Sequence, residues 1–301
     1  MPPIVDDWTE SLWFGQLLAV CGPGGTGAST VAAALAQGIG SDARYGGQVL
    51  LADAALHAEQ AMLHDSTELG PGIQELVEGH RLGRPDPDEI RRLTFEVPHR
   101  NYRLLLGLRQ AEAWVALRPK ATDAAIAGLR RSFQVVVADV TGDVEGEKET
   151  GSVDVEDRNH MARSLTSQAN VTVAVGTAGL KGVHSLAGLI RRLVRSGVGQ
   201  ERILAVVNRA PRHPVSRAES ARALAALLGA SGIELPLAGP LALPERNLED
   251  VFRHGGLFPE ALVRPLTQAV DALARRVADT APPLAIPVRI APGSLGTLSD
   301  G

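Results

Sequence analysis

The sequence predicts a doubly wound α/β fold, in which helices flank a mostly parallel β-sheet. Short apolar runs rich in valine and leucine alternate with helical patterns along most of the 301 residues. The runs are apolar on both faces, which is typical of strands buried between two layers of helices. The hydrophobic content of 45% is sufficient to bury a sizeable core.

The N-terminal half supplies the first part of this sheet. Strands are expected at 17–21, 49–52, 102–106 and 135–138, and helices at 29–37 and 122–131. The long stretch after the second strand contains a further helix start, the run Asp-Pro-Asp-Glu at 86–89. Aspartate caps a helix, proline suits its first turn, and acidic side chains favour its positive end.

The C-terminal half continues the alternation. Strands are expected at 171–175, 203–207 and 235–237, and helices at 183–195, 217–228 and 260–277. The last helix carries an apolar stripe formed by Leu262, Leu266, Val270, Leu273 and Val277. Because its polar face mixes both signs of charge, we expect this helix to pack in the core rather than on a membrane.

We expect the folded domain to span residues 16–279, with an N-terminal extension at 1–15 and a disordered tail at 280–301. The tail is rich in Pro, Gly and Ser, which is typical of disorder. The extension carries an apolar cluster of Trp8, Leu12, Trp13 and Phe14. This cluster either folds back on the first strand, which we favour, or anchors a partner or a membrane surface.

Charge and cysteine content exclude several classes of protein. The net charge of −4 gives no global attraction to nucleic acid, and the basic stripe of Arg191, Arg192 and Arg195 is interpreted as a solvated helix face. The single cysteine, Cys21, excludes an internal disulfide and suits a reducing compartment. No apolar run approaches the ~20 residues of a membrane span, and no signal-peptide pattern is present. We therefore expect a cytoplasmic location, with peripheral membrane association still open.

The strongest functional signal is a glycine-rich segment between the first strand and the first helix. It consists of Gly22, Pro23, Gly24, Gly25, Thr26, Gly27, Ala28, Ser29 and Thr30. Glycines let the backbone amides converge on an anion, and the helix N-terminus adds partial positive charge. The segment therefore predicts a phosphate-binding loop with Ser29 placed to hold Mg²⁺. The other interpretation is a glycine-rich turn that binds nothing.

One position of the phosphate-loop pattern G-x-x-x-x-G-K-[ST] is not matched, because Ala28 stands where the lysine belongs. That lysine neutralises the charge that develops during phosphoryl transfer. The sequence therefore predicts weak or absent ATP hydrolysis. Eight histidines are scattered without metal-ligand spacing, so no other catalytic centre is predicted.

The loop, the predicted sheet and the downstream motifs together resemble the ParA/MinD group of P-loop proteins over about residues 16–277, and most closely its CpaE/TadZ-like branch of pilus assembly and polar localisation. The resemblance implies a P-loop NTPase fold of the SIMIBI type that binds ATP or ADP with Mg²⁺. The group carries a second lysine just after the first glycine, which reaches the partner's nucleotide across a homodimer; here that residue is Pro23. Asp53 matches the first acid of the group's Asp-x-Asp motif, but Ala55 replaces the second, which positions the attacking water.

Further matches fall at later strand ends. The resemblance implies that Asp139 orders Mg²⁺ through water, with Gly142 in the second switch, and that Asn208 and Arg209 recognise the base. Segment 239–255 resembles the group's final nucleotide-edge loop and helix. Each match has a plainer interpretation, because an aspartate or asparagine at a strand end often only forms a turn or caps a helix.

Two charged features stay open. Lys181, which follows strand 171–175, either replaces the missing lysine at the phosphates or is a solvated loop residue. The run 141–158 is acidic through Asp143, Glu145, Glu147, Glu149, Asp154, Glu156 and Asp157. It is either a mobile, solvated loop or a docking surface for a basic partner.

Three functions follow from this pattern. The first is a nucleotide-binding or pseudo-ATPase scaffold that positions protein partners in pilus or secretion assembly or at a division site. The second is a working ATPase that switches between a monomer and a nucleotide-sandwiched homodimer, with Asp53 as the one candidate catalytic residue. The third is a P-loop enzyme of small-molecule metabolism, for which the sequence shows no substrate pocket.

Overall fold

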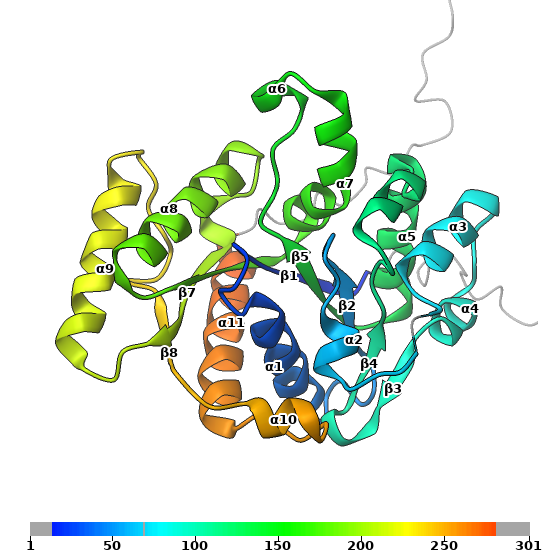
Figure 1. Cartoon of the computed structure of the whole chain (residues 1–301), viewed down its shortest axis with the longest axis horizontal. Helices are drawn as coiled ribbons and strands as arrows, with labels where there is room; N and C mark the ends of the chain where they lie inside the picture. The colour runs from blue at the N-terminus through cyan, green and yellow to red at the C-terminus, as the bar shows by residue number, and fades with distance from the viewer. Residues whose placement is uncertain (1–13, 69, 281–301) are drawn as a thin grey trace, which may run out of the picture.

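The computed structural model, described here for residues 14–68 and 70–280, contains an eight-stranded sheet in the order β3-β4-β2-β5-β1-β6-β7-β8 (Figure 1). The strands are β1 (Gln16–Gly22), β2 (Val49–Ala54), β3 (Phe95–Val97), β4 (Tyr102–Leu105), β5 (Val135–Thr141), β6 (Val171–Thr177), β7 (Ile203–Ala210) and β8 (Leu241–Pro244). All neighbouring pairs are parallel except β3–β4 at one edge. The predicted α/β fold with a mostly parallel sheet is confirmed.

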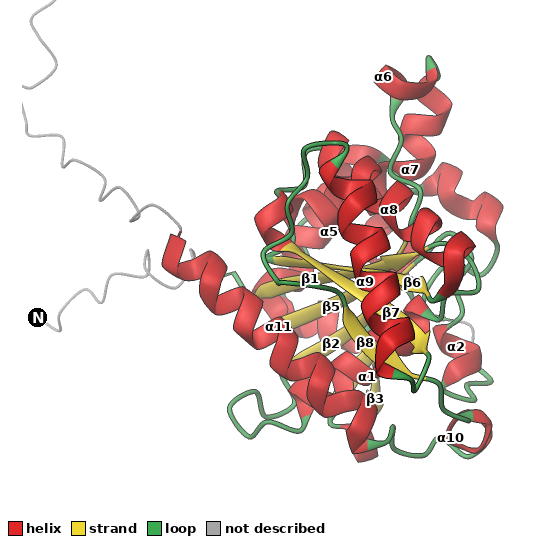
Figure 2. Ribbon diagram, turned by 90° about the vertical axis from the view of Figure 1, so that its left-hand side faces the viewer, coloured by secondary structure: helices red, strands yellow, loops and turns green. Residues whose placement is uncertain are grey.

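Helices cover both faces of the sheet. They are α1 (Ala28–Gly40), α2 (Gln60–Leu63), α3 (Ile73–Leu82), α4 (Pro87–Arg92), α5 (Pro119–Ser132), α6 (Glu147–Thr150), α7 (Val153–Gln168), α8 (Gly179–Arg195), α9 (Pro214–Gly229), α10 (Glu249–Arg253) and α11 (Glu260–Thr280). Helices α1 and α11 lie on one face, and α3, α5, α7, α8 and α9 lie on the other (Figures 1 and 2). None of the helices in the described part of the chain is long and apolar enough to cross a membrane.

The helix patterns of the sequence agree with this architecture. Asp86 caps α4, since its side chain accepts a hydrogen bond from the Glu89 amide at 2.8 Å. The apolar stripe of α11 faces the core, with Leu266 and Leu273 fully buried against the α1 side of the sheet. Core packing of the last helix is therefore confirmed.

The predicted strand at 235–237 is wrong. These residues form no strand, and the edge strand β8 lies at Leu241–Pro244 instead. Pro236, in the middle of the predicted run, lacks the N–H that a ladder needs. In β8 the proline stands at the end of an edge strand, where it is tolerated.

The chain ends fall mostly outside the described residues. Trp8, Leu12 and Trp13 lie there, as does the predicted tail after residue 280. Of the N-terminal cluster, Phe14 is described: it is half-exposed, with the Arg130 guanidinium 5.3 Å from its ring centroid.

The register of the central strands sets the position of the site. Asp53 in β2 lies opposite Asp139 in β5, and Asp139 lies opposite Val20 in β1. The carboxyl ends of these neighbouring strands therefore meet where β1 turns into the glycine-rich segment. In open parallel sheets, ligands bind at such an edge.

Candidate functional site

The glycine-rich segment joins β1 to α1 as an open loop. Gly25 and Gly27 have φ of 77° and 81°, a left-handed conformation that favours glycine. Thr26 fixes the curve between them, because its hydroxyl donates to the Pro23 carbonyl at 2.7 Å and its amide donates to the same oxygen. Helix α1 then begins at Ala28, and its first internal hydrogen bond runs from the Val31 amide to the Gly27 carbonyl.

The loop presents a row of backbone amides without protein partners. Within residues 14–68 and 70–280, no group accepts a hydrogen bond from the amides of Gly24, Gly25, Gly27, Ala28, Ser29 or Thr30. A helix start leaves its first amides without intrahelical acceptors, and the positive end of the helix dipole adds to their pull on an anion. The arrangement is suited to an anion with several oxygen atoms, such as a phosphate chain.

Two side chains from β7 hold the loop in this shape. The Asn208 side-chain amide donates to the Thr26 carbonyl at 2.9 Å, and an Arg209 terminal nitrogen donates to the Gly25 carbonyl at 3.1 Å. A Cβ atom at Gly27 would lie 2.6 Å from the Asn208 nitrogen, so no side chain fits there. Both β7 residues therefore lie at the predicted site, and in this structure they contact the loop backbone.

A cleft of about 470 Å³ opens in front of the loop. Its walls are the loop itself, residues of segments 55–59 and 139–143, and the side chains of Arg192 and Arg209. This volume lies in the range of small-molecule binding sites. The loop is neither collapsed nor filled by side chains.

Two buried carboxylates lie side by side at the cleft, and one of them, Asp139, forms part of its wall. Asp53 is 0% exposed and Asp139 is 1% exposed. Gln60 links them, since its backbone amide donates to Asp53 at 2.9 Å and its side-chain amide donates to Asp139 at 2.8 Å. Burial raises the pKa of both carboxyl groups, and the neighbouring charge of Asp139 adds to the rise at Asp53. A bound cation would offset this cost of burying negative charge.

The groups around Asp139 fit Mg²⁺ in their chemistry. They offer oxygen atoms, which hard cations prefer, and a hydrogen bond between Ser29 and Asp139 lowers the pKa of that carboxyl group against the effect of burial. Thr141 belongs to the cleft wall, and its buried hydroxyl has no hydrogen-bond partner in the part of the chain that the structure describes. The described residues contain no group of three or more His, Cys, Asp or Glu side chains that could hold a metal by themselves. Magnesium would therefore need phosphate oxygens and water as further ligands.

The structure brings most of the predicted site residues to the cleft. The loop residues other than Thr26 line it, together with Asp139 and Arg209. Thr26, Asp53 and Asn208 do not line the cleft but contact the loop or lie opposite Asp139, whereas Lys181 does neither. Lys181 is exposed in the first turn of α8. Sequence reasoning missed Gln60, which carried no motif, and interpreted Arg192 only as part of a solvated stripe.

Segment 239–255, which resembled a nucleotide-edge loop in the sequence, does not line the cleft. Its last residues, 253–255, do not line the cleft; they precede Gly256, whose carbonyl accepts hydrogen bonds at 3.0 and 2.7 Å from the buried Arg100 side chain. Arg100 lies beside the C-terminal end of α1, whereas the glycine loop lies at its N-terminal end.

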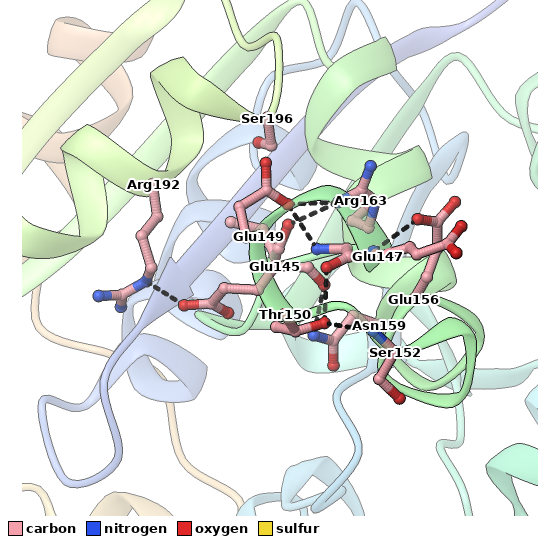
Figure 3. A network of polar contacts seen from close by, with 12 residues as sticks. Glu145, Glu147, Glu149, Thr150, Ser152, Glu156, Asn159, Arg163, Arg192 and Ser196 are labelled. Atoms are coloured by element: carbon pink, nitrogen blue, oxygen red, sulfur yellow. Dashed lines mark hydrogen bonds and ion pairs between the residues drawn. The ribbon is translucent and has the colours of Figure 1, made fainter.

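The acidic run 141–158 is not a single loop, because it contains α6 and the start of α7 (Figure 1), and a network of polar contacts connects its residues (Figure 3). It completes β5, forms α6 and begins α7, which Ser152 caps. Local hydrogen bonds fix its course, because Asn159 donates to the Glu145 carbonyl at 2.9 Å and Arg163 donates to the Val144 carbonyl at 3.0 Å. Buried Val144 and Asn159 anchor a segment that charge alone marked as solvated.

No protein-family model matches the sequence, and no curated protein matches it. Solved structures do. A ParA family ATPase from Chlorobium tepidum is 14% identical, with a TM-score of 0.61 over 87% of this chain and 98% of that one. MinD in the MinC:MinD complex from Aquifex aeolicus is 18% identical, with a TM-score of 0.58 over 90% and 99%. The ATP complex of McdA from Cyanothece is 15% identical, with a TM-score of 0.55 over 88% and 96%.

The chain has the fold of the ParA and MinD ATPases. At these identities the likeness shows the fold alone, and it covers almost the whole length of each neighbour. The sequence resemblance and the structural comparison therefore agree on the architecture. The CpaE/TadZ-like branch rests on the sequence resemblance.

Proposed function

We propose that this protein binds ATP or ADP with Mg²⁺ in the cleft of the glycine loop. The observation that carries the proposal is the row of amides at 24, 25 and 27–30, which have no acceptor among the described residues and border an open cleft next to Asp139 and Ser29. Among the cleft-lining residues, the carboxylates of Glu59, Asp139 and Asp143 outnumber the guanidinium groups of Arg192 and Arg209. A polyphosphate therefore needs a divalent cation to enter. The McdA neighbour was solved with ATP.

The bound nucleotide would serve positioning rather than rapid turnover. Ala28 offers no ammonium group to the outer phosphates, Pro23 offers none to a partner's nucleotide, and Ala55 offers no carboxylate to an attacking water. A domain that binds nucleotide but hydrolyses it slowly is suited to a scaffold. We propose that it acts in the cytoplasm on protein partners, in pilus or secretion assembly or at a division site, as a monomer or a homodimer. The solved complex of MinD with MinC is a precedent for such a partner.

Calorimetric titration with ATP and ADP, each with and without Mg²⁺, tests the proposal. We expect saturable binding of both nucleotides with Mg²⁺, and tighter binding by Ala28→Lys, because a lysine at this position reaches the outer phosphates. Ala225→Lys, at an exposed residue of α9 that does not line the cleft, is the control for added charge. Absence of binding by both the natural protein and Ala28→Lys would refute the proposal.

A working ATPase is the second candidate. It is favoured by one observation, which is that Arg192 and Arg209 bring guanidinium groups to a cleft that lacks the loop lysine. Arginine stabilises charge on a transferring phosphoryl group in other P-loop proteins. Measurement of phosphate release separates the two functions, since the scaffold predicts turnover near the background rate.

A further inference from the structure

Arg192 brings a positive charge to the cleft from helix α8, whereas the sequence pattern predicted a solvated position for it. It lies in the last turn of α8, whose Leu189 approaches the edge of the site: a Cβ at Gly142 would lie 3.3 Å from the Leu189 side chain and 3.2 Å from the Gly22 carbonyl oxygen. Helix α8 therefore passes directly beside the start of the glycine loop. The Arg192 side chain is 29% exposed and lines the cleft, so it is accessible to a bound anion.

The positive charge of Arg192 acts on Cys21, the residue that directly precedes the glycine loop. Burial raises the pKa of the Cys21 thiol to about 12, and the charge of Asp139 adds to that rise, while the positive charge of Arg192 opposes it. Cys21 directly precedes Gly22, the first residue of the loop. The guanidinium group therefore acts electrostatically on the end of β1, and it lines the same cleft as the loop that follows.

Among the described residues, the one ion-pair partner of Arg192 is Glu145, and that contact leaves its two terminal nitrogens available. Its Nε lies 3.0 Å from a carboxylate oxygen of Glu145, whose side chain is 31% exposed. This contact lacks hydrogen-bond geometry, since the buried Nε atom has no hydrogen-bond partner within residues 14–68 and 70–280. In the described parts of the chain, no group accepts a hydrogen bond from either terminal nitrogen, and Figure 3 shows both on the side away from Glu145.

We propose that Arg192 contacts the phosphates of the bound nucleotide in place of the lysine missing at Ala28, and that Glu145 is the counter-ion it leaves when the nucleotide binds. The inference rests on the proposed nucleotide binding. A phosphate chain carries several negative charges and accepts two parallel hydrogen bonds from a guanidinium group, whereas Glu145 offers a single charge in poor geometry. The exchange therefore favours the nucleotide.

The other candidate cations are less suited to this role. Lys181 is exposed and does not line the cleft. Arg209 does line it, but one of its terminal nitrogens is used to hold the Gly25 carbonyl. Arg192 is therefore the cleft cation whose terminal nitrogens are not already engaged in holding the loop.

The exchange would also link the cleft to α6. Glu145 lies two residues before α6, and its carbonyl is held by Asn159 of α7 at 2.9 Å. When Arg192 turns to phosphate, the Glu145 carboxylate loses its ion-pair partner at the root of the acidic segment. Bound nucleotide would thereby change the charge that α6 and the start of α7 present to a partner.

Titration of Mg²⁺–ATP and Mg²⁺–pyrophosphate into two variants tests the inference. Arg192→Gln is expected to weaken both ligands about tenfold, in line with the loss of a charge-assisted hydrogen bond. Glu145→Gln is expected to tighten both, because it removes the competing carboxylate. Arg191→Gln, one residue earlier on α8 and outside the cleft lining, is the matched control and should bind as the natural protein does.

The outcomes separate this inference from the proposed function. If Arg192→Gln binds as tightly as Arg191→Gln, the inference is wrong although the nucleotide site stands. If the natural protein and Ala28→Lys bind neither ligand, both are wrong. If Arg192→Gln fails to fold, Glu145→Gln decides, since a purely structural ion pair predicts unchanged or weaker binding rather than tighter binding.

Discussion

The two ends of α1 are built in opposite ways. At the N-terminal end, the amides of residues 24–30 other than that of Thr26 have no acceptor in the described chain and face an open cleft. At the C-terminal end, the buried Gln37 side chain exchanges two hydrogen bonds with the backbone of Phe258, at 3.1 and 2.9 Å. The buried Arg100 side chain lies over the Phe258 ring, 4.6 Å from its centroid. The fold satisfies its polar groups at one end of this helix and leaves them available at the other, which is the pattern of a scaffold that carries a site.

We call the C-terminal end of α1 the closed end and its N-terminal end the open end. The largest effect on stability is expected at the closed end. Gln37→Ala leaves the buried amide and carbonyl of Phe258 without partners, and we expect the free energy of unfolding to fall by about 3 kcal/mol. Nucleotide affinity of the folded fraction should not change. Urea unfolding with the exposed Gln110→Ala as the control checks this. If Gln37→Ala lowers the free energy of unfolding no more than the Gln110→Ala control does, water or a neighbouring side chain replaces Gln37.

A lower pH should also reduce the stability of the fold near the closed end, where Tyr102 contacts both Arg100 and His64. Burial lowers the pKa of His64 to about 4, and its ring nitrogens contact the Gln60 carbonyl at 2.7 Å and the Tyr102 hydroxyl at 2.5 Å. Between pH 6.5 and 4 the unfolded chain binds a proton that the native state does not, so stability falls as the pH falls. We expect a loss of up to about 3 kcal/mol from this group.

The measurement for His64 is the pH dependence of the unfolding free energy. His64→Gln removes the titrating group, so its curve should be flatter between pH 6.5 and 4. Gln110→Ala, at an exposed residue that does not titrate, should keep the natural slope. Equal slopes for all three proteins would show that His64 is not held neutral by burial.

At the open end, the site depends on the backbone conformation of the glycine loop rather than on one side chain. Gly27→Ala forces a Cβ into a left-handed conformation and against Asn208, and we expect a loss of about 2 kcal/mol in stability and of nucleotide binding. Gly24→Ala is the control for stability, because a Cβ at that position meets no atom of the described residues within 4 Å. Thermal melting and titration check both. Binding by Gly27→Ala at natural affinity would contradict the role of the loop shape.

The smallest expected effect concerns the cation. Removal of Mg²⁺ with EDTA should weaken ATP at least about tenfold, because phosphates then meet the carboxylates of the cleft without compensation. Asp139→Asn should reduce this dependence on Mg²⁺, whereas Asp123→Asn on α5 should not. Equal ATP affinity with and without Mg²⁺ would contradict the assignment of the metal to Ser29 and Asp139.

The sequence predicted the open end well and the closed end poorly. The glycine loop is contiguous, and its spacing after a strand and before a helix is itself the signal. Alternation of apolar runs and helices likewise predicted the sheet, although the antiparallel edge strand β3 and helix α7 were missed. In α7 the many charged residues masked the inward-facing Met161 and Leu165.

Contacts between distant segments could not be predicted in the same way. Gln60 joins the site through hydrogen bonds to Asp53 and Asp139, and no residue pattern around it indicates this. Arg192 was recognised as basic, but its approach to the cleft depends on the path of α8 across the ends of β1 and β5. Periodicity assigns a residue to a helix face; it does not give the side chains that this face meets.

The contacts of Asn208 and Arg209 change how substitutions in β7 must be interpreted. Loss of nucleotide binding in Asn208→Ala would ordinarily suggest a lost contact with the base. Here the same loss would follow from a distorted loop, because the Thr26 carbonyl would no longer be restrained. A screen with purine and pyrimidine nucleotides distinguishes the two causes. A distorted phosphate-binding loop weakens the binding of all these nucleotides equally, whichever heterocycle they carry.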